Sequence, residues 1–266
     1  MAISEVTGRF ESLRDLTQGS YGSVYLARDK RTDEEVVIKK IRKKAEGYTR
    51  IRNEIKANMI LKERDVDTCG FHGFFSSHLD THLVFDYITG MDLYYVMHSR
   101  GFKPLPELAV RHILRCVAQT LSTCHRAGIA HRDVKLENIM VTPEHDDRVY
   151  LIDFGLCSFF DKDAEEEAFS RDYSGSSHYM SPEVIRHIPL RGTLADAWSL
   201  GVTAYALIFG SFPYGVRDAE QIFKGSESIP LPKDAGEVTL SPHMRHKLSR
   251  LLTVDPDRRA SVEILL

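Results

Sequence analysis

Two short polar runs carry the side chains of this chain that are best suited to chemistry. Residues 131–138 read HRDVKLEN, and the tripeptide DFG begins at Asp153. Asp133 offers a carboxylate that accepts a proton, and Lys135 offers a cation that can face an anionic group. Asn138 and Asp153 supply oxygen ligands of the kind that Mg²⁺ prefers. These residue types, in this order, suit the transfer of a phosphoryl group.

Both runs resemble the HRDxKxxN and DFG motifs of protein kinases, and the resemblance covers residues from about 10 to 266. It implies a phosphotransferase that uses ATP and Mg²⁺ and acts on a protein. Asp133 would be the catalytic base, or would orient the acceptor hydroxyl, because a loose transition state depends more on positioning than on deprotonation. Lys135 would balance charge on the transferred group, and Asn138 and Asp153 would hold two Mg²⁺ ions.

The same loop indicates the acceptor and the subgroup. Lys135 belongs to the serine/threonine form of the motif, so the resemblance implies a serine/threonine kinase. Leu136, together with the GVTAYAL segment that begins at Gly201, resembles most the calcium/calmodulin-dependent group, which includes relatives of the AMP-activated kinase. Glu137 occupies a position at which members of that group often bind a substrate arginine upstream of the phosphorylated residue. Leu156, which follows the DFG, is of the residue type that the family associates with serine rather than threonine as the acceptor.

Composition excludes several other classes. The chain has 266 residues, 42% of them hydrophobic, which allows one bilobal unit or two ordinary domains. A net charge of −3 gives no basic footprint for nucleic acid. The first residues lack the apolar core of a signal peptide, and no apolar run reaches about 18 residues. We therefore expect no membrane association and an intracellular protein, cytoplasmic or nuclear. Four widely spaced cysteines without a CxxC argue against disulfides and structural zinc.

Apolar patterning divides the chain into two parts. β-branched residues alternate around one helical stretch as far as about Phe85, whereas apolar helix patterns dominate afterwards, for example at 108–124 and 194–209. Gly90 permits a sharp change of direction between them. We predict an α+β, bilobal protein kinase fold. A lead-in at residues 1–9 precedes a small β-rich N-lobe with one long helix at 10–85. A hinge at 86–90 then connects it to a larger, mainly helical C-lobe at 91–266.

A glycine-containing segment resembles the loop that covers the phosphates in kinases, where a missing side chain lets the backbone approach them. Its residues are Leu16, Thr17, Gln18, Gly19, Ser20, Tyr21, Gly22, Ser23 and Val24. Taken alone, the segment fits a tight hairpin equally well. Lys39, fifteen residues past Val24, matches the lysine that holds the α and β phosphates, and Glu54 on the following helix matches its partner.

The resemblance also implies an adenine pocket. Its walls would be Leu16, Val24 and Val37 on one side and Met140 on the other, with Phe85 at the back. The backbone of Asp86 and Ile88 would bind the polar edge of the base, and Asp92 would bind the ribose hydroxyls. These apolar residues also suit an ordinary core, because pocket walls are continuous with the core.

Two departures from the family pattern leave an alternative open. Thr17 replaces the first glycine of the usual trio, and Asn58 places an amide where the family packs an apolar side chain between the lobes. A pseudokinase that binds nucleotide or partners without catalysis is therefore the second interpretation. The pseudokinase interpretation is disfavoured by the joint presence of the five catalytic residues, which are Lys39, Glu54, Asp133, Asn138 and Asp153. A small-molecule kinase is disfavoured by the SPE segment at residues 181–183, which matches the family's APE.

Arg132 beside the proposed base suggests a switch, because such an arginine needs an anion from the loop after DFG. Counting back three residues from Gly175 leads to Asp172. A built-in carboxylate could pair with Arg132 and with Arg50, and would allow partial activity without phosphorylation. Alternatively Asp172 is solvated, and the switch is Ser170, Tyr173 or Ser174.

Two further contacts follow from the resemblance. Ser176 would bond Asp133 and Lys135, and Glu183 would pair with Arg259. The chain stops one turn into the expected final helix, so we expect a trimmed domain or a minimal kinase. A regulatory tail or partner outside this chain is left open, and the pattern does not identify the substrate.

Overall fold

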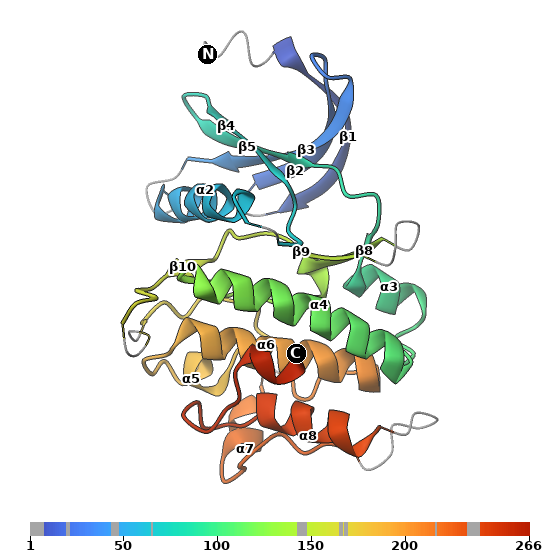
Figure 1. Ribbon diagram of the computed structural model, residues 1–266, viewed down its shortest axis with the longest axis vertical. Helices are drawn as coiled ribbons and strands as arrows, with labels where there is room; N and C mark the ends of the chain where they lie inside the picture. The colour runs from blue at the N-terminus through green and yellow to red at the C-terminus, as the bar shows by residue number, and fades with distance from the viewer. Residues whose placement is uncertain are drawn as a thin grey trace. The chain divides into compact units, whose positions relative to one another are not determined.

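The computed structural model describes residues 8–19, 22–43, 48–64, 66–142, 148–164, 167, 170–215, 217–232 and 240–266. The chain divides into two compact units, Met1–Thr89 and Gly90–Leu266. The boundary falls at the end of the segment that we expected to be a hinge. Figure 1 shows a β-rich first unit and a mainly helical second unit, each of which is described by itself below.

The described part of the amino-terminal unit is built on an antiparallel sheet with the strand order β1-β2-β3-β5-β4. The strands are β1 (Phe10–Gly19), β2 (Gly22–Asp29), β3 (Glu34–Arg42), β4 (Phe71–Ser76) and β5 (Asp80–Asp86). One helix, α2 (Tyr48–Lys62), lies in the chain between β3 and β4 and packs against β4 (Figure 1).

Alternation along β3 separates the two faces of this sheet, because successive side chains of a strand point to opposite sides. Val36 and Ile38 belong to an apolar cluster with Ala27 and Val84. Val37 belongs to the other cluster, which includes Ile55 of α2 together with Phe71, Leu83 and Phe85. Lys39 is two residues beyond Val37, so it lies on the face that α2 covers.

The carboxyl-terminal unit contains most of the helices. They are α3 (Leu93–Ser99), α4 (Glu107–Arg126), α5 (Pro182–Ile185), α6 (Gly192–Phe209), α7 (Ala219–Phe223) and α8 (Pro242–Leu251), with short 3-10 helices η2 (Leu136–Asn138) and η3 (Val262–Leu265). The strands are short: β6 (Met91–Asp92), β7 (Ile129–Ala130), β8 (Ile139–Thr142), β9 (Arg148–Leu151) and β10 (Ser158–Phe159).

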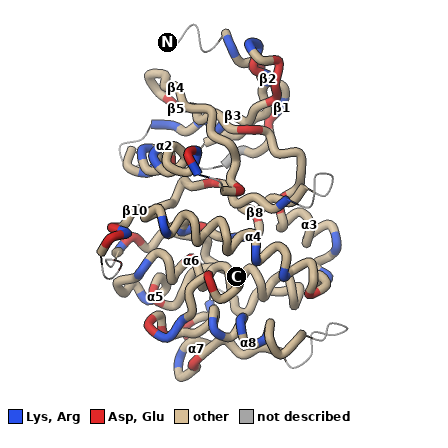
Figure 2. Tube along the Cα trace, in the orientation of Figure 1, with Lys and Arg blue, Asp and Glu red and all other residues tan. Residues whose placement is uncertain are grey.

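Helix α6 is the centre of this unit. Fourteen of its 18 residues are buried, and α4 and α8 both pack against it. A helix that is apolar on all sides is stable only in an interior, and Asp196 is its one charged residue, so α6 is nearly all tan in Figure 2. It ends at Gly210, whose φ of 69° suits glycine and where a Cβ would lie 2.0 Å from the carbonyl oxygen of Phe102.

The predicted α+β architecture is confirmed, with a β-sheet in the first unit and a helical second unit. The apolar patterns expected at 108–124 and 194–209 correspond to α4 and α6, within two residues at each end. Among the described residues, no helix combines the length and the apolar character needed to span a bilayer.

Candidate active site

Lys39 and Glu54 form an ion pair inside the amino-terminal unit. Nζ of Lys39 lies 2.7 Å from Oε1 of Glu54, and the glutamate side chain is only 2% exposed. The pair forms because β3 presents Lys39 to α2, which carries Glu54 on its buried face. Asn58, one turn later, is also buried, and its side-chain amide donates to the main-chain oxygen of Glu54 at 2.8 Å. A buried carboxylate beside one cation holds that ammonium group in a defined position.

The glycine-containing segment lies at the end of the β1–β2 hairpin. Thr17 pairs with Val24, Gln18 with Ser23, and Gly19 with Gly22. The predicted phosphate-loop residues Ser20 and Tyr21 lie outside the described residues. Gly22 has a structural reason of its own, because a Cβ there would lie 2.0 Å from the main-chain oxygen of Lys40 on β3. The close approach of two strands therefore requires this glycine independently of any nucleotide.

The sheet brings together most of the predicted adenine contacts of this unit. Val24 lies opposite Lys39, and Val37 lies opposite Phe85. Leu16, Val24 and Val37 are half-buried, whereas Phe85 is buried. The register places Val24, Val37 and Phe85 on the face of the sheet that carries Lys39, which is compatible with the predicted pocket wall, and contact with a nucleotide stays a prediction.

The start of the predicted hinge is held by the segment before β4. The main-chain nitrogen of Asp86 donates to Gly70 O at 2.8 Å, and Sγ of Cys69 donates to Asp86 O at 3.1 Å. His72 Nε2 lies 2.6 Å from the carboxylate of Asp86. Burial raises the pKa of the Cys69 thiol to about 12, so it stays a protonated donor. No motif or spacing in the sequence predicts these contacts. Ile88, the other residue whose backbone is predicted to bind the base, is half-buried.

In the carboxyl-terminal unit Asp92 and Met140 lie opposite each other on β6 and β8. Asp92 is also the N-cap of α3, and its Oδ1 accepts a hydrogen bond from Tyr95 N at 2.7 Å. Capping satisfies a helix amide that would otherwise lack a partner. A structural task therefore accounts for this carboxylate, and its contact with a ribose stays a prediction.

Asp133 lies at the centre of a network of hydrogen-bond donors. Its Oδ1 accepts from Ser176 Oγ at 2.8 Å, and its Oδ2 accepts from Lys135 Nζ at 2.7 Å and from Asn138 Nδ2 at 3.1 Å. Lys135 Nζ also lies 2.8 Å from Ser176 Oγ. Asp133 is 8% exposed. Three donors fix the direction of this carboxylate, which is the requirement for a group that positions a reacting hydroxyl.

Asp196 of α6 holds the backbone of this loop. Its two carboxylate oxygens accept from His131 N at 2.8 Å and Arg132 N at 2.7 Å, and His125 Nε2 lies 2.9 Å away. Burial alone raises the pKa of Asp196, but the hydrogen bond from His125 and the neighbouring positive groups outweigh burial and leave the pKa below its ordinary value of 3.8. The carboxylate is therefore ionised and holds Arg132 at a φ of 68°.

The two predicted metal ligands lie at the same end of the β8–β9 hairpin. Ile139 pairs with Leu151, and the next bond outward joins Ile152 N to Asn138 O at 2.9 Å. Asn138 directs its amide nitrogen to Asp133, donating to the main-chain oxygen at 2.8 Å as well as to the carboxylate. Asp153 is exposed, has a φ of 65° and accepts from Gly155 N at 3.0 Å.

Carboxylate and amide oxygens at one hairpin end fit a hard cation such as Mg²⁺, which commonly takes one or two protein oxygens and completes its shell with phosphates and water. Asn138 meets this test because Asp133 occupies its nitrogen and leaves its oxygen for a further group. Within the described residues, no group of three or more His, Cys, Asp or Glu side chains could hold a metal ion.

Arg132 reaches the following segment through its guanidinium. Nη2 donates to the main-chain oxygen of Asp172, and the carboxylate of Asp172 accepts from the nitrogen and hydroxyl of Ser174. Nη1 of Arg132 is buried and has no partner among the described residues. Pairing of Arg132 with the carboxylate of Asp172 stays a hypothesis. Arg50 lies on α2 in the other unit, so its relation to Asp172 also stays a prediction.

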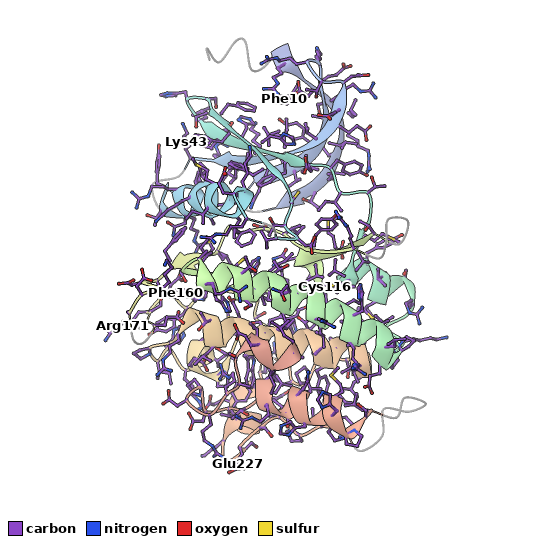
Figure 3. The ribbon with its side chains drawn as sticks, in the orientation of Figure 1. Phe10, Lys43, Cys116, Phe160, Arg171 and Glu227 are labelled. Carbon is purple, nitrogen blue, oxygen red and sulfur yellow. The ribbon has the colours of Figure 1, made fainter. Side chains whose placement is uncertain are left out.

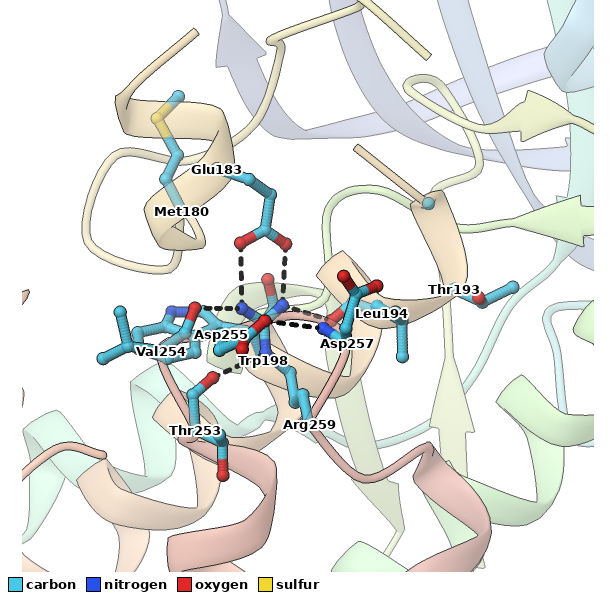
Figure 4. A network of polar contacts seen from close by, with 12 residues as sticks. Met180, Glu183, Thr193, Leu194, Trp198, Thr253, Val254, Asp255, Asp257 and Arg259 are labelled. Atoms are coloured by element: carbon cyan, nitrogen blue, oxygen red, sulfur yellow. Dashed lines mark hydrogen bonds and ion pairs between the residues drawn. The ribbon is translucent and has the colours of Figure 1, made fainter. Parts of the chain in front are cut away.

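The pairing of Glu183 with Arg259 that we expected is present. Arg259 Nη1 and Nη2 lie 2.7 and 2.8 Å from the two carboxylate oxygens, as the parallel dashed lines in Figure 4 show. Burial alone raises the pKa of Glu183, but its bonds to Arg259 outweigh burial and leave the pKa below the ordinary value of 4.5.

Two contacts near the catalytic loop were missed from the sequence. Tyr179 OH donates to Glu137 Oε2 at 3.2 Å and accepts from Leu136 N at 3.3 Å. Glu167 accepts hydrogen bonds from Gly192 and Thr193 at the start of α6. Both join segments more than twenty residues apart, and no spacing rule connects such positions.

The two units thus carry the parts of a phosphoryl-transfer apparatus, and a comparison with known families agrees. The family model described as "Protein kinase domain" matches residues 10–266. The chain therefore belongs to the protein kinase family, whose members generally use ATP and Mg²⁺.

Individual kinases show similarity along nearly the whole chain. NUAK family SNF1-like kinase 1 of Homo sapiens is 30% identical over 259 residues, which cover 96% of this chain and 37% of that protein. NUAK family SNF1-like kinase 2 of Rattus norvegicus is 33% identical over 264 residues, covering 96% and 39%. CBL-interacting protein kinase 16 of Oryza sativa subsp. japonica is 32% identical over 266 residues, covering 97% and 55%. The chain spans about two fifths of the NUAK relatives, and the predicted relationship to AMP-activated-kinase relatives is confirmed.

Proposed function

We propose that this domain transfers the γ-phosphoryl group of ATP to a serine or threonine hydroxyl of a protein. The acceptor oxygen forms a bond to the γ-phosphorus while the bond to the leaving ADP oxygen breaks. The proton of the hydroxyl passes to the carboxylate of Asp133. Lys135 balances the negative charge of the transferred group, and Lys39, aimed by Glu54, holds the α and β phosphates.

One observation carries this proposal: the three donors that converge on the carboxylate of Asp133. Lys135, Asn138 and Ser176 fix both of its oxygens. Such a carboxylate is held in place before a substrate arrives, so little reorganisation accompanies the reaction. Residues with only a capping or scaffolding task would not need a lysine and a half-buried serine directed at the same acid.

Asn138 and Asp153 would hold Mg²⁺, which neutralises charge on the phosphates when it is bound. The adenine and ribose would contact Leu16, Val24, Val37, Phe85, Asp86, Ile88, Asp92 and Met140.

Transfer of radiolabelled phosphate from ATP to a library of serine and threonine peptides tests the proposal. We expect Mg²⁺-dependent labelling by the unaltered domain and a loss of at least about a thousandfold in Asp133→Asn and Asp153→Asn. The same proteins are titrated with ATP by calorimetry. Binding of ATP without any labelling would replace the proposal with the pseudokinase interpretation, and labelling of small alcohols instead of peptides would indicate a metabolic kinase.

A protein substrate is the partner that this activity requires. One relative, CBL-interacting protein kinase 16, is named for an interaction with CBL. By analogy we propose a regulatory protein partner for this chain as well. An intracellular location is part of the same proposal, because ATP and protein substrates are available there. Imaging of a fluorescent fusion tests the location, and cross-linking followed by mass spectrometry tests the partner.

A further inference from the structure

An acidic side chain of the segment after DFG is bound to the start of α6. We call residues 153–183 the activation segment. Oε1 of Glu167 accepts from Gly192 N at 2.6 Å, and Oε2 accepts from Thr193 N at 3.3 Å and from the Thr193 hydroxyl. Arg191, the N-cap residue of α6, makes no side-chain capping bond. Glu167 therefore supplies the cap that the helix lacks, from 25 residues away.

Two main-chain contacts continue this attachment along the same segment. Ser170 and Leu190 pair in antiparallel fashion, with N to O distances of 2.7 and 3.0 Å. Arg132 then donates to the main-chain oxygen of Asp172. Glu167 and Ser170 thus contact the start of α6 and the connection that leads into it, and Asp172 contacts the catalytic loop. Among these three anchors, only the one at Glu167 depends on a side chain of the activation segment.

The helix that Glu167 caps also holds the catalytic loop. Asp196, four residues after Gly192, accepts the main-chain amides of His131 and Arg132. Gly192 itself allows the approach, because a Cβ there would lie 3.3 Å from both Glu167 Oε1 and Arg132 Cδ, and 2.6 Å from Ala130 Cβ. The first turn of α6 is therefore the common support of the activation segment and of the loop that carries Asp133.

We propose that Glu167 is a positioning residue that docks the activation segment on the N-terminus of α6 without any phosphate. A carboxylate at this end is favoured by the helix dipole and by two amides that have no partner inside the helix. Docking at this point places Ser176, which lies later in the same segment, against Asp133. The consequence for catalysis rests on the proposed kinase function, whereas the docking itself does not.

The test compares the unaltered domain with Glu167→Gln, Glu167→Ala and the matched control Asp163→Asn, all treated with phosphatase. Asp163 is an exposed carboxylate of the same segment that pairs with its neighbour Lys162. Two structural readouts are used: hydrogen exchange of the Gly192 and Thr193 amides, and tryptic cleavage after Arg171, which is exposed and points outward in Figure 3. Values of kcat and KM for a peptide substrate are measured in parallel.

In Glu167→Ala we expect exchange at Gly192 and Thr193 and cleavage after Arg171 to accelerate by about two- to thirtyfold, the range that loss of a helix cap produces. Glu167→Gln should fall between Ala and the unaltered protein, because its amide oxygen still accepts a hydrogen bond without the charge. A several-fold loss of kcat should follow the same order. Asp163→Asn should leave all three readouts unchanged.

Unchanged exchange and cleavage in Glu167→Ala overturn the proposal, whatever happens to activity. Equal acceleration in Asp163→Asn also overturns it, because the effect would then be one of charge in general. If Glu167→Ala does not fold, the Gln variant decides by the same criteria. If every protein, including the unaltered one, fails to phosphorylate peptides, the proposed function falls while the exchange data still decide the docking.

Discussion

Arg259 and Glu183 face each other through two parallel hydrogen bonds in the interior of the carboxyl-terminal unit, with side-chain exposures of 0% and 1%. The guanidinium also lies over the ring of Trp198, 4.9 Å from its centroid, and donates to Thr253 O at 2.9 Å. The pair joins α5, at the end of the activation segment, to the loop between α8 and η3. Its enclosure makes it sensitive to the loss of either partner.

Substituting Arg259→Met should lower the free energy of unfolding by about 3–5 kcal/mol, because it leaves the carboxylate of Glu183 buried without a cation. Urea denaturation followed by circular dichroism measures the change. Arg258→Met is the matched control. Arg258 pairs with Glu227 at 3.3 Å on the surface, and such exposed pairs contribute less than about 1 kcal/mol. Equal effects of the two substitutions would show that enclosure is not the cause.

Stability should decrease at acid pH partly through Glu183. Its pKa in the folded protein is below its ordinary value of 4.5, so its contribution is fully present above about pH 4.5 and is lost as the pH falls through the depressed pKa. The pKa of Asp196 is also below its ordinary value of 3.8, so its contribution to stability is likewise lost as the pH falls through that depressed pKa. Urea denaturation between about pH 6 and about pH 3 measures the free energy of unfolding as a function of pH. The double variant Glu183→Gln/Arg259→Met should have an acid slope smaller by up to about 1.4 kcal/mol per pH unit. An identical slope would exclude a contribution from Glu183.

Lys39→Met should reduce kcat/KM by at least about a hundredfold, because the phosphates lose their positioned cation. It should also cost about 2–4 kcal/mol of stability, since the buried carboxylate of Glu54 would lose the cation that lies 2.7 Å away. Lys40→Met is the control one residue away, where the side chain is 44% exposed and lies 3.3 Å from Asp80. Peptide phosphorylation and thermal unfolding measure both effects. Retained activity in Lys39→Met would remove this lysine from the proposed mechanism.

Asn58→Leu should leave the protein as stable or raise stability by about 1 kcal/mol. The buried amide donates to Glu54 O, a carbonyl that the helix ladder already uses, so little hydrogen bonding is lost while apolar contact is gained. Asn58→Ala is the comparison and should destabilise, because it opens a cavity. Thermal unfolding of the three proteins measures the order. A large loss in the Leu variant would show that the amide is needed for the Lys39–Glu54 geometry.

Much of this protein follows from short-range sequence patterns. The apolar patterns at 108–124 and 194–209 predicted α4 and α6 within two residues, because burial periodicity is present in consecutive positions. The HRDVKLEN and DFG runs likewise indicated the protein kinase family, and the family comparison confirms this.

Tertiary structure decided the features that join distant or irregular segments. Arg132 and Asp153 adopt positive φ values that the types of these residues do not predict, and Asp196 holds the first of them from another helix. Glu167 meets Gly192 from 25 residues away in the chain, a separation that no helix or strand period connects. Such contacts depend on which backbone amides the fold leaves without partners and which side chains it brings within reach. That information exists only in the folded arrangement, because neighbouring residues in the chain do not encode it.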